Sequence, residues 1–383
     1  MATNFLKQKI CFLFLLLACA VSLRAQNDVK LNFTNSRTYA GIEVGSKGVK
    51  MSIVEINKKN KKGAGFLVLK DTAINSDFIS FSPPTFFATL NAMQALFDKA
   101  VKQYEIPSEK IFTTISSGVK IQADKEEKIT WINNLADSFK VRIAEPNRKV
   151  AIIDVLEEAR LSHLGIVPEE RRYNTFLIDI GSGNSKGGYF PNGNTTDLKL
   201  FQLGWGTKST NNAVDKRCEN DKTIQNYQKQ LTRVLAGAVN SDVVYAVNES
   251  GAYAMNDYIA FSGGIAWSVS TLLYPELIDN SVVPVTYEEV EKLLDNLYKK
   301  YSSFSDVALI KNLSDKSLDK EKISKEIKTV HQVFDQKSLM AGAGLLLKVM
   351  RQFDGVYERK EFYLVKNGQV GWISAYVTQE VRK

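Results

Sequence analysis

The sequence predicts an α/β protein of two domains with a cleft between them, and three observations support this. The chain has 383 residues, which is too long for one small hydrophobic core and about right for two domains. Strand-like and helix-like segments alternate in both halves. One type of hairpin, with an acidic residue followed by glycine and serine, occurs once in each half. We place the domains at residues 26–150 and 151–383, with the C-terminal segment as a candidate to pack back on the first domain.

The first half contains short apolar runs typical of strands and longer segments with helical spacing. Gly165, with a proline three residues later, ends the helix expected at 152–164, which lies at the boundary between the two halves. A basic turn at residues 58–63 joins the second and third strands. The expected strands span 38–44, 49–56, 65–70, 110–115 and 141–144, and the expected helices span 85–104, 125–139 and 152–164.

The second half also contains both strands and helices. Its expected strands span 175–180, 186–190 and 198–203, and its expected helices span 224–237, 266–273, 287–301 and 339–353. Residues 315–333 are rich in charge and predict a surface helix or a pair of helices. Two short apolar segments, 362–366 and 370–377, close the chain.

Residues 1–25 have the composition of a secretory signal: a basic start, an apolar run at 10–23 and small residues at the end. Cleavage is expected after Ala25, so the protein is predicted to be exported, either periplasmic or extracellular. The apolar run is too short to span a bilayer comfortably, and no other segment is long enough. A lipoprotein cleavage box at 16–19, with the lipid on Cys19, is the minority alternative.

The remaining composition excludes several classes of site. Hydrophobic residues make up 44% and charged residues 24%, as in ordinary globular proteins. Residues 1–25 hold three basic residues and no acidic one, so cleavage takes the net charge from +8 to +5. That charge favours a polyanionic ligand, but no nucleic-acid recognition motif is present. Cleavage would leave Cys218 alone, so no internal disulfide and no zinc site are expected.

The repeated hairpin is the most informative motif. Residues 39–56 read YAGIEVGSKGVKMSIVEI, and residues 175–190 read TFLIDIGSGNSKGGYF. Both consist of an apolar strand, an acidic residue, one apolar residue, Gly-Ser, a small turn and a second strand. The matching residues are Glu43, Gly45 and Ser46 in the first hairpin and Asp179, Gly181 and Ser182 in the second.

Such turns suit the binding of phosphate. Glycine lets the backbone come close to a ligand, and successive N–H groups can face phosphate oxygens. The acidic residues Glu43 and Asp179 can hold Mg²⁺ or its water ligands beside those phosphates. A third turn precedes a helix whose first N–H groups could bind another phosphate. The expected phosphate contacts are Gly45, Ser46 and Lys47, then Gly181, Ser182, Gly183, Asn184 and Ser185, and in the third turn Ser262, Gly263 and Gly264.

Paired acid-glycine hairpins are the pattern of the actin, hexokinase and Hsp70 superfamily, whose domains are ribonuclease H-like. The helix sequence Glu157-Glu158-Ala159-Arg160-Leu161, shortly before Asp-Ile-Gly, narrows the resemblance to the exopolyphosphatase and guanosine pentaphosphate phosphatase family (Ppx/GppA). This resemblance covers about residues 38–377. Other stretches that agree are Ser116 to Lys120, Leu203-Gly204 followed by Thr207, Phe261 to Gly264, and Met340 to Ala343.

The resemblance implies two actin-like domains with the active site between them. It implies Mg²⁺-dependent removal of terminal phosphates from polyphosphate or a related phosphorylated small molecule. The glutamate directly before Ala-Arg-Leu acts in that family as the base for the attacking water, and Glu158 holds this position here. Lys120 stands where the family has a phosphate-binding arginine. The expected partner is the phosphorylated ligand, and a homodimer is a further option.

The chain departs from the family pattern within the site itself. Glu43 replaces an aspartate, which moves any metal contact by one methylene. Lys120 keeps the charge of an arginine but lacks its bidentate fork. The family sequence Gly-Gly-Ser-Thr-Glu corresponds here to residues 182–186, so that Lys186 replaces a glutamate and reverses a charge. The C-terminal Gly-Leu-Arg-Glu-Gly is also absent.

Three functions therefore stay open at the level of sequence. An exported exopolyphosphatase-like hydrolase would need Glu158 as its base. A binding protein of the cell envelope with the same fold would hold polyanions without turnover. An actin-like assembly protein is allowed by the fold, since a fold does not fix a function, but no feature of the sequence indicates polymerisation.

Overall fold

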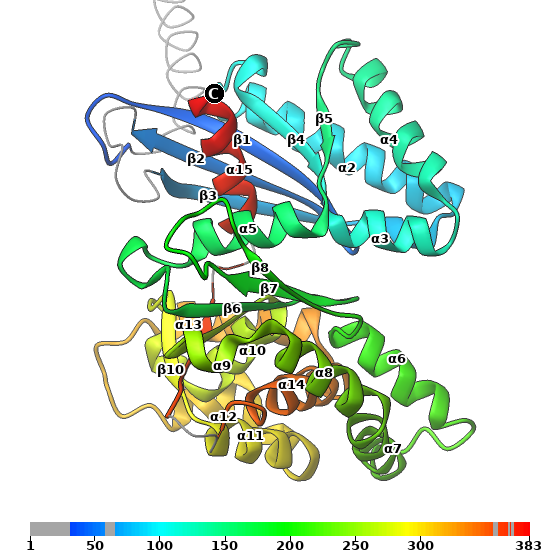
Figure 1. The fold of residues 1–383 in the computed structure, drawn as a ribbon, viewed down its shortest axis with the longest axis vertical. Helices are drawn as coiled ribbons and strands as arrows, with labels where there is room; N and C mark the ends of the chain where they lie inside the picture. Colours follow the sequence, from blue (N-terminus) through cyan, green and yellow to red (C-terminus); the bar gives the residue numbers. More distant parts are fainter. Residues whose placement is uncertain (1–30, 58–65, 355–358, 367, 369–370) are drawn as a thin grey trace, which may run out of the picture.

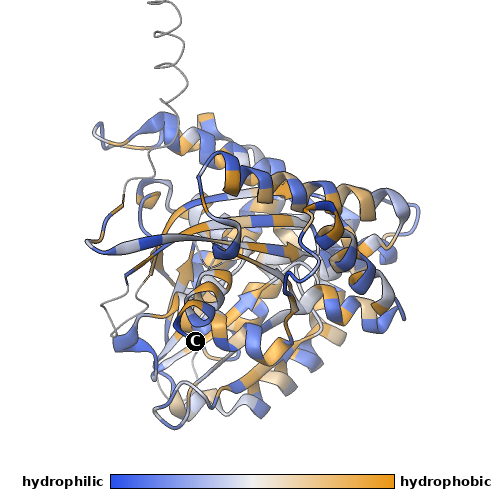
Figure 2. Ribbon diagram, turned by 90° about the horizontal axis from the view of Figure 1, so that it is seen from above, coloured by the Kyte–Doolittle hydropathy of each residue, from blue (hydrophilic) through white to orange (hydrophobic). Residues whose placement is uncertain are grey.

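A computed structural model describes residues 31–57, 66–354, 359–366, 368 and 371–383. The expected signal at 1–25 and the basic turn at 58–63 lie outside the described residues. The molecule has two β-sheets with helices packed on them, one in each half of the chain (Figure 1). Viewed from above, polar residues gather on the outer helices and loops, and apolar residues follow the sheets and inner helix faces (Figure 2).

The first sheet has five strands in the order β3-β2-β1-β4-β5. The hairpin strands pair antiparallel, and β4 and β5 add in parallel beside β1. Helices α2, α3 and α4 belong to this half, and buried aliphatic and aromatic side chains of α2 and α4 form its core with β1 and β2. The bounds are β1 Ser36–Gly45, β2 Gly48–Asn57, β3 Phe66–Asn75, α2 Pro83–Lys102, β4 Ile111–Ile115, α3 Ser117–Lys125, α4 Ile129–Arg142 and β5 Val150–Ile152.

The second sheet has six strands in the order β10-β11-β9-β6-β7-β8. Its largest core lies between this sheet and the helices from α6 to α14. The strands are β6 Thr175–Ile180, β7 Ser185–Tyr189, β8 Lys199–Leu203, β9 Tyr258–Ser262, β10 Val282–Val285 and β11 Glu361–Val365. The helices are α6 Thr207–Arg217, α7 Ile224–Ala236, α8 Ala238–Ser250, α9 Ala252–Met255, α10 Gly264–Leu273, α11 Tyr287–Lys299, α12 Asp306–Lys311, α13 Lys320–Val333 and α14 Gln336–Met350.

The two sheets share one topology. Strands β8-β7-β6-β9-β11 repeat the order and directions of β3-β2-β1-β4-β5, and β10 is an added edge strand. The repeated hairpin of the sequence therefore opens two copies of one structural unit. In each unit a parallel strand, β4 or β9, lies beside the first hairpin strand and leads into a helix at the same end of the sheet.

Two helices cross between the halves. Helix α5 (Val155–Ile166) packs on β7, and helix α15 (Gly371–Arg382) packs on α5 and on β1 and β2. Figure 1 shows α15, at the end of the chain, lying against the sheet formed by the first strands. The crossing is very close: a Cβ added to Gly165 would lie 2.1 Å from the carbonyl oxygen of Gly371. Glycine is required there because any side chain would push the two helices apart.

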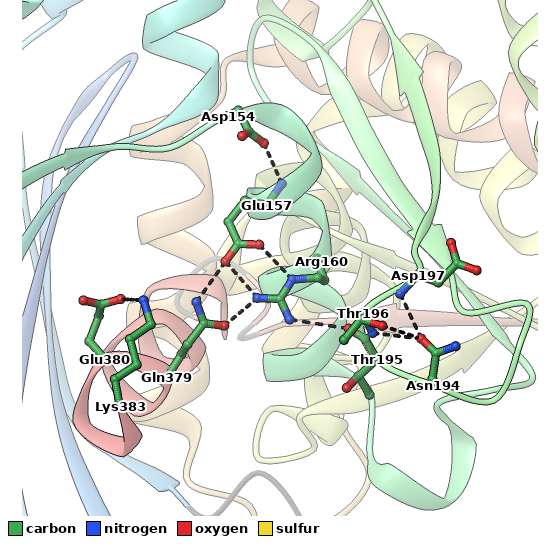
Figure 3. A network of polar contacts seen from close by, with 10 residues as sticks. All are labelled: Asp154, Glu157, Arg160, Asn194, Thr195, Thr196, Asp197, Gln379, Glu380 and Lys383. Atoms are coloured by element: carbon green, nitrogen blue, oxygen red, sulfur yellow. Dashed lines mark hydrogen bonds and ion pairs between the residues drawn. The ribbon is translucent and has the colours of Figure 1, made fainter.

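A polar network holds the same two helices together (Figure 3). Asp154 caps α5 by accepting the Glu157 N–H at 2.8 Å. The Arg160 guanidinium binds the Glu157 carboxylate at 2.7 and 2.8 Å, and Gln379 of α15 donates to the same carboxylate at 3.0 Å. The interface therefore combines a tight backbone contact with a hydrogen bond from Gln379 to a bidentate ion pair that lies within α5.

Most expected elements are present, and one is wrong. The strand expected at 141–144 is absent, because α4 continues to Arg142 and leaves Val141 exposed. The edge strand lies instead at Val150–Ile152. The family-like stretch from Ser116 to Lys120 lies mostly in helix α3, and the final apolar segment at 370–377 lies largely in helix α15.

No helix among the described residues is both long and apolar enough to cross a bilayer.

Replacing Gly165 by alanine is expected to destabilise the protein by about 2–3 kcal/mol, because the new methyl group cannot fit against Gly371. Urea unfolding followed by circular dichroism measures this loss. Gly204→Ala is the matched control, since a Cβ at Gly204 has nothing within 4 Å. Equal stability of the two variants would contradict the close crossing.

Candidate functional site

The two glycine turns face each other at the junction of the halves. The turn between β1 and β2 carries Ser46, and the turn between β6 and β7 carries Asn184. Gly118, in the first turn of α3, lies between them: a Cβ there would be 3.5 Å from the Ser46 Oγ and 3.8 Å from the Asn184 Oδ1. Three segments that are distant in the sequence therefore bring their backbones to one place.

The second turn is held by the start of helix α6. The Thr207 N–H donates to the Gly181 carbonyl at 2.9 Å, and the Lys208 N–H donates to the Ser182 carbonyl at 2.7 Å. The Ser209 hydroxyl donates to the Gly183 carbonyl at 2.9 Å. The Gly181 N–H donates to the Asn184 carbonyl at 3.0 Å, so the carbonyl groups of the turn are all engaged. The N–H groups of residues 182–184 and the Asn184 side chain are the groups that could face a ligand.

Four charged side chains lie beneath the turns. Lys186, on β7, places its Nζ 2.8 Å from Glu158 Oε1 and 3.8 Å from Asp179 Oδ2. Lys186 and Glu158 are nearly inaccessible to solvent, with side-chain exposures of 7% and 3%. Burial opposes the charge of Lys186, but the carboxylates of Glu158 and Asp179 outweigh it and raise its pKa. Lys186 therefore stays protonated.

Both carboxylates have further partners that fix their positions. Glu158 Oε2 accepts the backbone N–H of Ser117 at 2.6 Å, which ties α5 to the start of α3. Asp179 Oδ1 accepts the hydroxyl of Ser262 at 2.9 Å, which ties β6 to the third turn. In that turn Gly263 has a φ of 94°, a left-handed conformation that glycine adopts without strain.

Glu43 completes this group from the first sheet. Its side chain is buried, and its Oε2 has no hydrogen-bond partner among the described residues. Burial raises its pKa to about 7; Lys50 opposes the rise, and Glu158 adds to it. An acidic residue that is buried without a partner favours its neutral form near neutral pH.

Two further lysines come together at the edge of the site. Burial and the neighbouring Lys208 lower the pKa of Lys47. Lys208 lies 3.5 Å from Asp77 of the opposite half, and Lys47 lies 5.9 Å from the Phe334 ring centroid. Lys208 was not expected at the site from the sequence, although its position directly after the family-like Gly204…Thr207 stretch was a signal for it.

The other residues expected to contact phosphate differ in their burial and in their contacts. Ser185 is buried, and its hydroxyl donates to the Trp205 carbonyl at 2.7 Å. This hydroxyl therefore stabilises the fold. Lys120 is half-buried on α3. Gly264 begins α10 directly after Gly263, which places a helix N-terminus beside Asp179.

The residues present do not fit direct ligation of Mg²⁺ by Glu43 and Asp179. The described residues contain no group of three or more His, Cys, Asp or Glu side chains arranged to hold a metal ion. Instead, the ammonium group of Lys186 lies among the carboxylates. Glu43 also carries a raised pKa, which weakens it as a ligand near neutral pH.

No protein-family model matches the chain, and no curated protein matches it. Several solved structures match the chain. A Ppx/GppA family member from Aquifex aeolicus superposes with a TM-score of 0.61 at 14% identity, covering 91% of this chain and 98% of that one. The fold is that of the Ppx/GppA proteins. The expected two-domain, actin-like architecture is therefore confirmed.

Two further structures agree with the Ppx/GppA fold. An exopolyphosphatase-like protein has a TM-score of 0.58 at 14% identity, covering 90% of this chain and 99% of that one. An exopolyphosphatase from Cytophaga hutchinsonii has a TM-score of 0.52 at 12% identity, covering 90% and 98%. At these identities the likeness establishes the fold alone, so function has to be argued from the site.

The stability of the protein is expected to depend on the protonation of Glu43. Its folded pKa of about 7 lies above its ordinary 4.5, so the stabilisation is full below 4.5 and is lost as pH rises through 7. Urea unfolding at pH 5 and pH 8 should show the wild type losing about 2 kcal/mol relative to Glu43→Gln. Glu249→Gln, at an exposed position of α8, is the control and should track the wild type. A constant difference between wild type and Glu43→Gln would contradict the assignment.

Proposed function

We propose that this protein binds a chain of linked phosphates between the two turns and hydrolyses its terminal phosphoanhydride bond. The observation that carries the proposal is the convergence of the turns above a buried, oriented glutamate. Ser46, Gly118 and Asn184 define the place for the ligand, and Glu158 lies in the same site. The likeness to exopolyphosphatase structures supports the choice of ligand class.

Binding would use backbone N–H groups first. The turn at 181–184 and the N-termini of α3 and α10 present donors that match phosphate oxygens, and a helix N-terminus favours negative charge. Lys47 and Lys208 add positive charge at the edge of the site. The net positive charge of the chain assists the approach of a polyanion.

The chemistry would need one positioned water and little covalent participation by the protein. Glu158 would take a proton from the water as its oxygen forms a bond to the terminal phosphorus. The bond from that phosphorus to the bridging oxygen breaks, and the shortened phosphate chain leaves with the electron pair. Each oxygen of Glu158 keeps a lone pair beyond its present bond, to Ser117 or to Lys186, so it can accept this proton.

Three further expectations belong to this proposal. Mg²⁺ accompanies phosphate chains in solution, and it would enter bound to the ligand, because the side chains of the site do not fit it directly. Export would follow from the signal at residues 1–25. The homodimer is an assembly to be tested by the mass of the protein in solution.

Glu158→Gln is expected to reduce phosphate release from polyphosphate by about 10²–10⁴-fold, because the amide cannot accept the proton. Phosphate release is measured with Mg²⁺ and with a chelator. Glu157→Gln is the control, since Glu157 faces Arg160 and Gln379 and lies outside the site (Figure 3). Equal activity of Glu158→Gln and wild type would remove Glu158 from the mechanism.

Binding without hydrolysis is the second candidate function. One observation favours it: both oxygens of Glu158 already have partners, Ser117 and Lys186, which reduces their readiness to accept a proton. A wild type that binds polyphosphate but releases no phosphate under any of these conditions would establish this alternative.

Lys208→Ala and Lys47→Ala are each expected to weaken polyphosphate binding by about threefold to tenfold. Each lysine is expected to contribute its charge to the phosphate contacts, so the dependence of affinity on salt should also become shallower. Calorimetric titration at two salt concentrations measures both effects. Lys299→Ala, in an exposed ion pair on α11, is the control and should bind like the wild type. Unchanged binding in both test variants would place the ligand elsewhere.

A further inference from the structure

One ammonium group is enclosed by carboxylates in this site. Lys186 contacts Glu158 at 2.8 Å and lies 3.8 Å from Asp179, and both it and Glu158 are buried. Glu43 is buried on the first sheet, and its Oε2 has no hydrogen-bond partner among the described residues. Glu158 and Asp179 therefore share one cation, and carboxylate oxygens are also the ligands that hard metal ions prefer.

The strand pairing determines where this ammonium lies. Lys186 on β7 stands directly opposite Asp179 on β6 in the antiparallel register, so the two side chains project from the same face. Helix α5 packs on β7 and brings Glu158 to the lysine. The cation is therefore a side chain of the sheet itself, and unlike a bound metal ion it cannot dissociate into the solvent.

A divalent ion at the same place would conflict with the lysine. A metal bound by Glu158 and Asp179 would come within a few ångströms of a buried ammonium, where like charges repel strongly. The lysine would also have to give up its ion pair with Glu158. One buried position cannot hold both cations.

We propose that the ammonium group of Lys186 takes the place of a divalent metal ion, and that Glu158 and Asp179 can hold such an ion only when Lys186 is removed. Where catalysis is concerned, this inference rests on the proposed function. An ammonium has three N–H donors, and the Glu158 bond uses one. A remaining donor can face a phosphoryl oxygen and neutralise part of its charge, as a resident ion would.

The test is a titration of the full chain with Mn²⁺ alone. Binding is measured by calorimetry and by the electron paramagnetic resonance signal of the free ion. The wild type is expected to show no binding at this site. Lys186→Ala is expected to gain one site, about tenfold or more tighter than any binding to the wild type, because Glu158 and Asp179 lose their internal cation. Mn²⁺ should also raise the Tm of this variant and leave the Tm of the wild type unchanged.

Matched variants separate this site from weak binding elsewhere. Lys102→Ala removes an exposed lysine paired with Asp98 and makes the same change in net charge, so it should gain no site. Lys186→Arg keeps a cation in place and should also gain none. Adding Asp179→Asn to Lys186→Ala should abolish the gain. A folded Lys186→Ala that binds no Mn²⁺ would overturn the inference.

The outcome is independent of whether the protein hydrolyses phosphate. Failure of the proposed function would appear as a lack of phosphate release from polyphosphate, with the Mn²⁺ results unchanged. Circular dichroism checks that each variant is folded, and Lys186→Ser replaces Lys186→Ala if the latter does not fold. If neither variant folds, the titration of the wild type with Mn²⁺ is the deciding measurement. A wild-type Mn²⁺ site that Asp179→Asn removes would overturn the inference. The absence of such a site would support it.

Discussion

The buried carboxylate of Glu158 joins the two halves of this molecule. It accepts the Ser117 N–H from the first half and binds the Lys186 ammonium from the second. Removing one partner of a buried ion pair leaves an uncompensated charge and typically costs about 3–5 kcal/mol. The site between the two turns is therefore organised around one side chain.

The crossing of α5 and α15 fixes the position of the Glu158 side chain. Helix α5 leaves the first sheet and packs on β7, and α15 leaves the second sheet and packs on β1 and β2. The contact between Gly165 and Gly371 and the network of Glu157, Arg160 and Gln379 hold this exchange in place (Figure 3). Glu157 and Glu158 are neighbours in sequence, yet one faces the helix crossing and the other the cleft, because successive helical residues point about 100° apart.

Charge balance distinguishes this site from a site built for a metal ion. Lys186 supplies one positive charge, and Glu43 takes up a proton near pH 7 to limit the negative charge around it. Both adjustments follow from burial, since an uncompensated charge in a low-dielectric interior is costly. The site thus carries its own cation and leaves its backbone donors for a ligand.

The sequence by itself determined the strands of both hairpins, several helices and the hairpin repeat, because these follow from local periodicity and from the special geometry of glycine. It did not predict strands β9 and β10 or helices α6 and α8. It also indicated Glu43, Glu158 and Asp179 as residues of interest. It misplaced a strand at 141–144, where Val141 belongs to an exposed helix face. Only the tertiary structure decided the direction of Lys186, the inward hydroxyl of Ser185 and the approach of Lys208 to Lys47. The physical reason is that each of these depends on partners distant in the chain, whose contacts arise when α5, α6 and the two hairpins pack together.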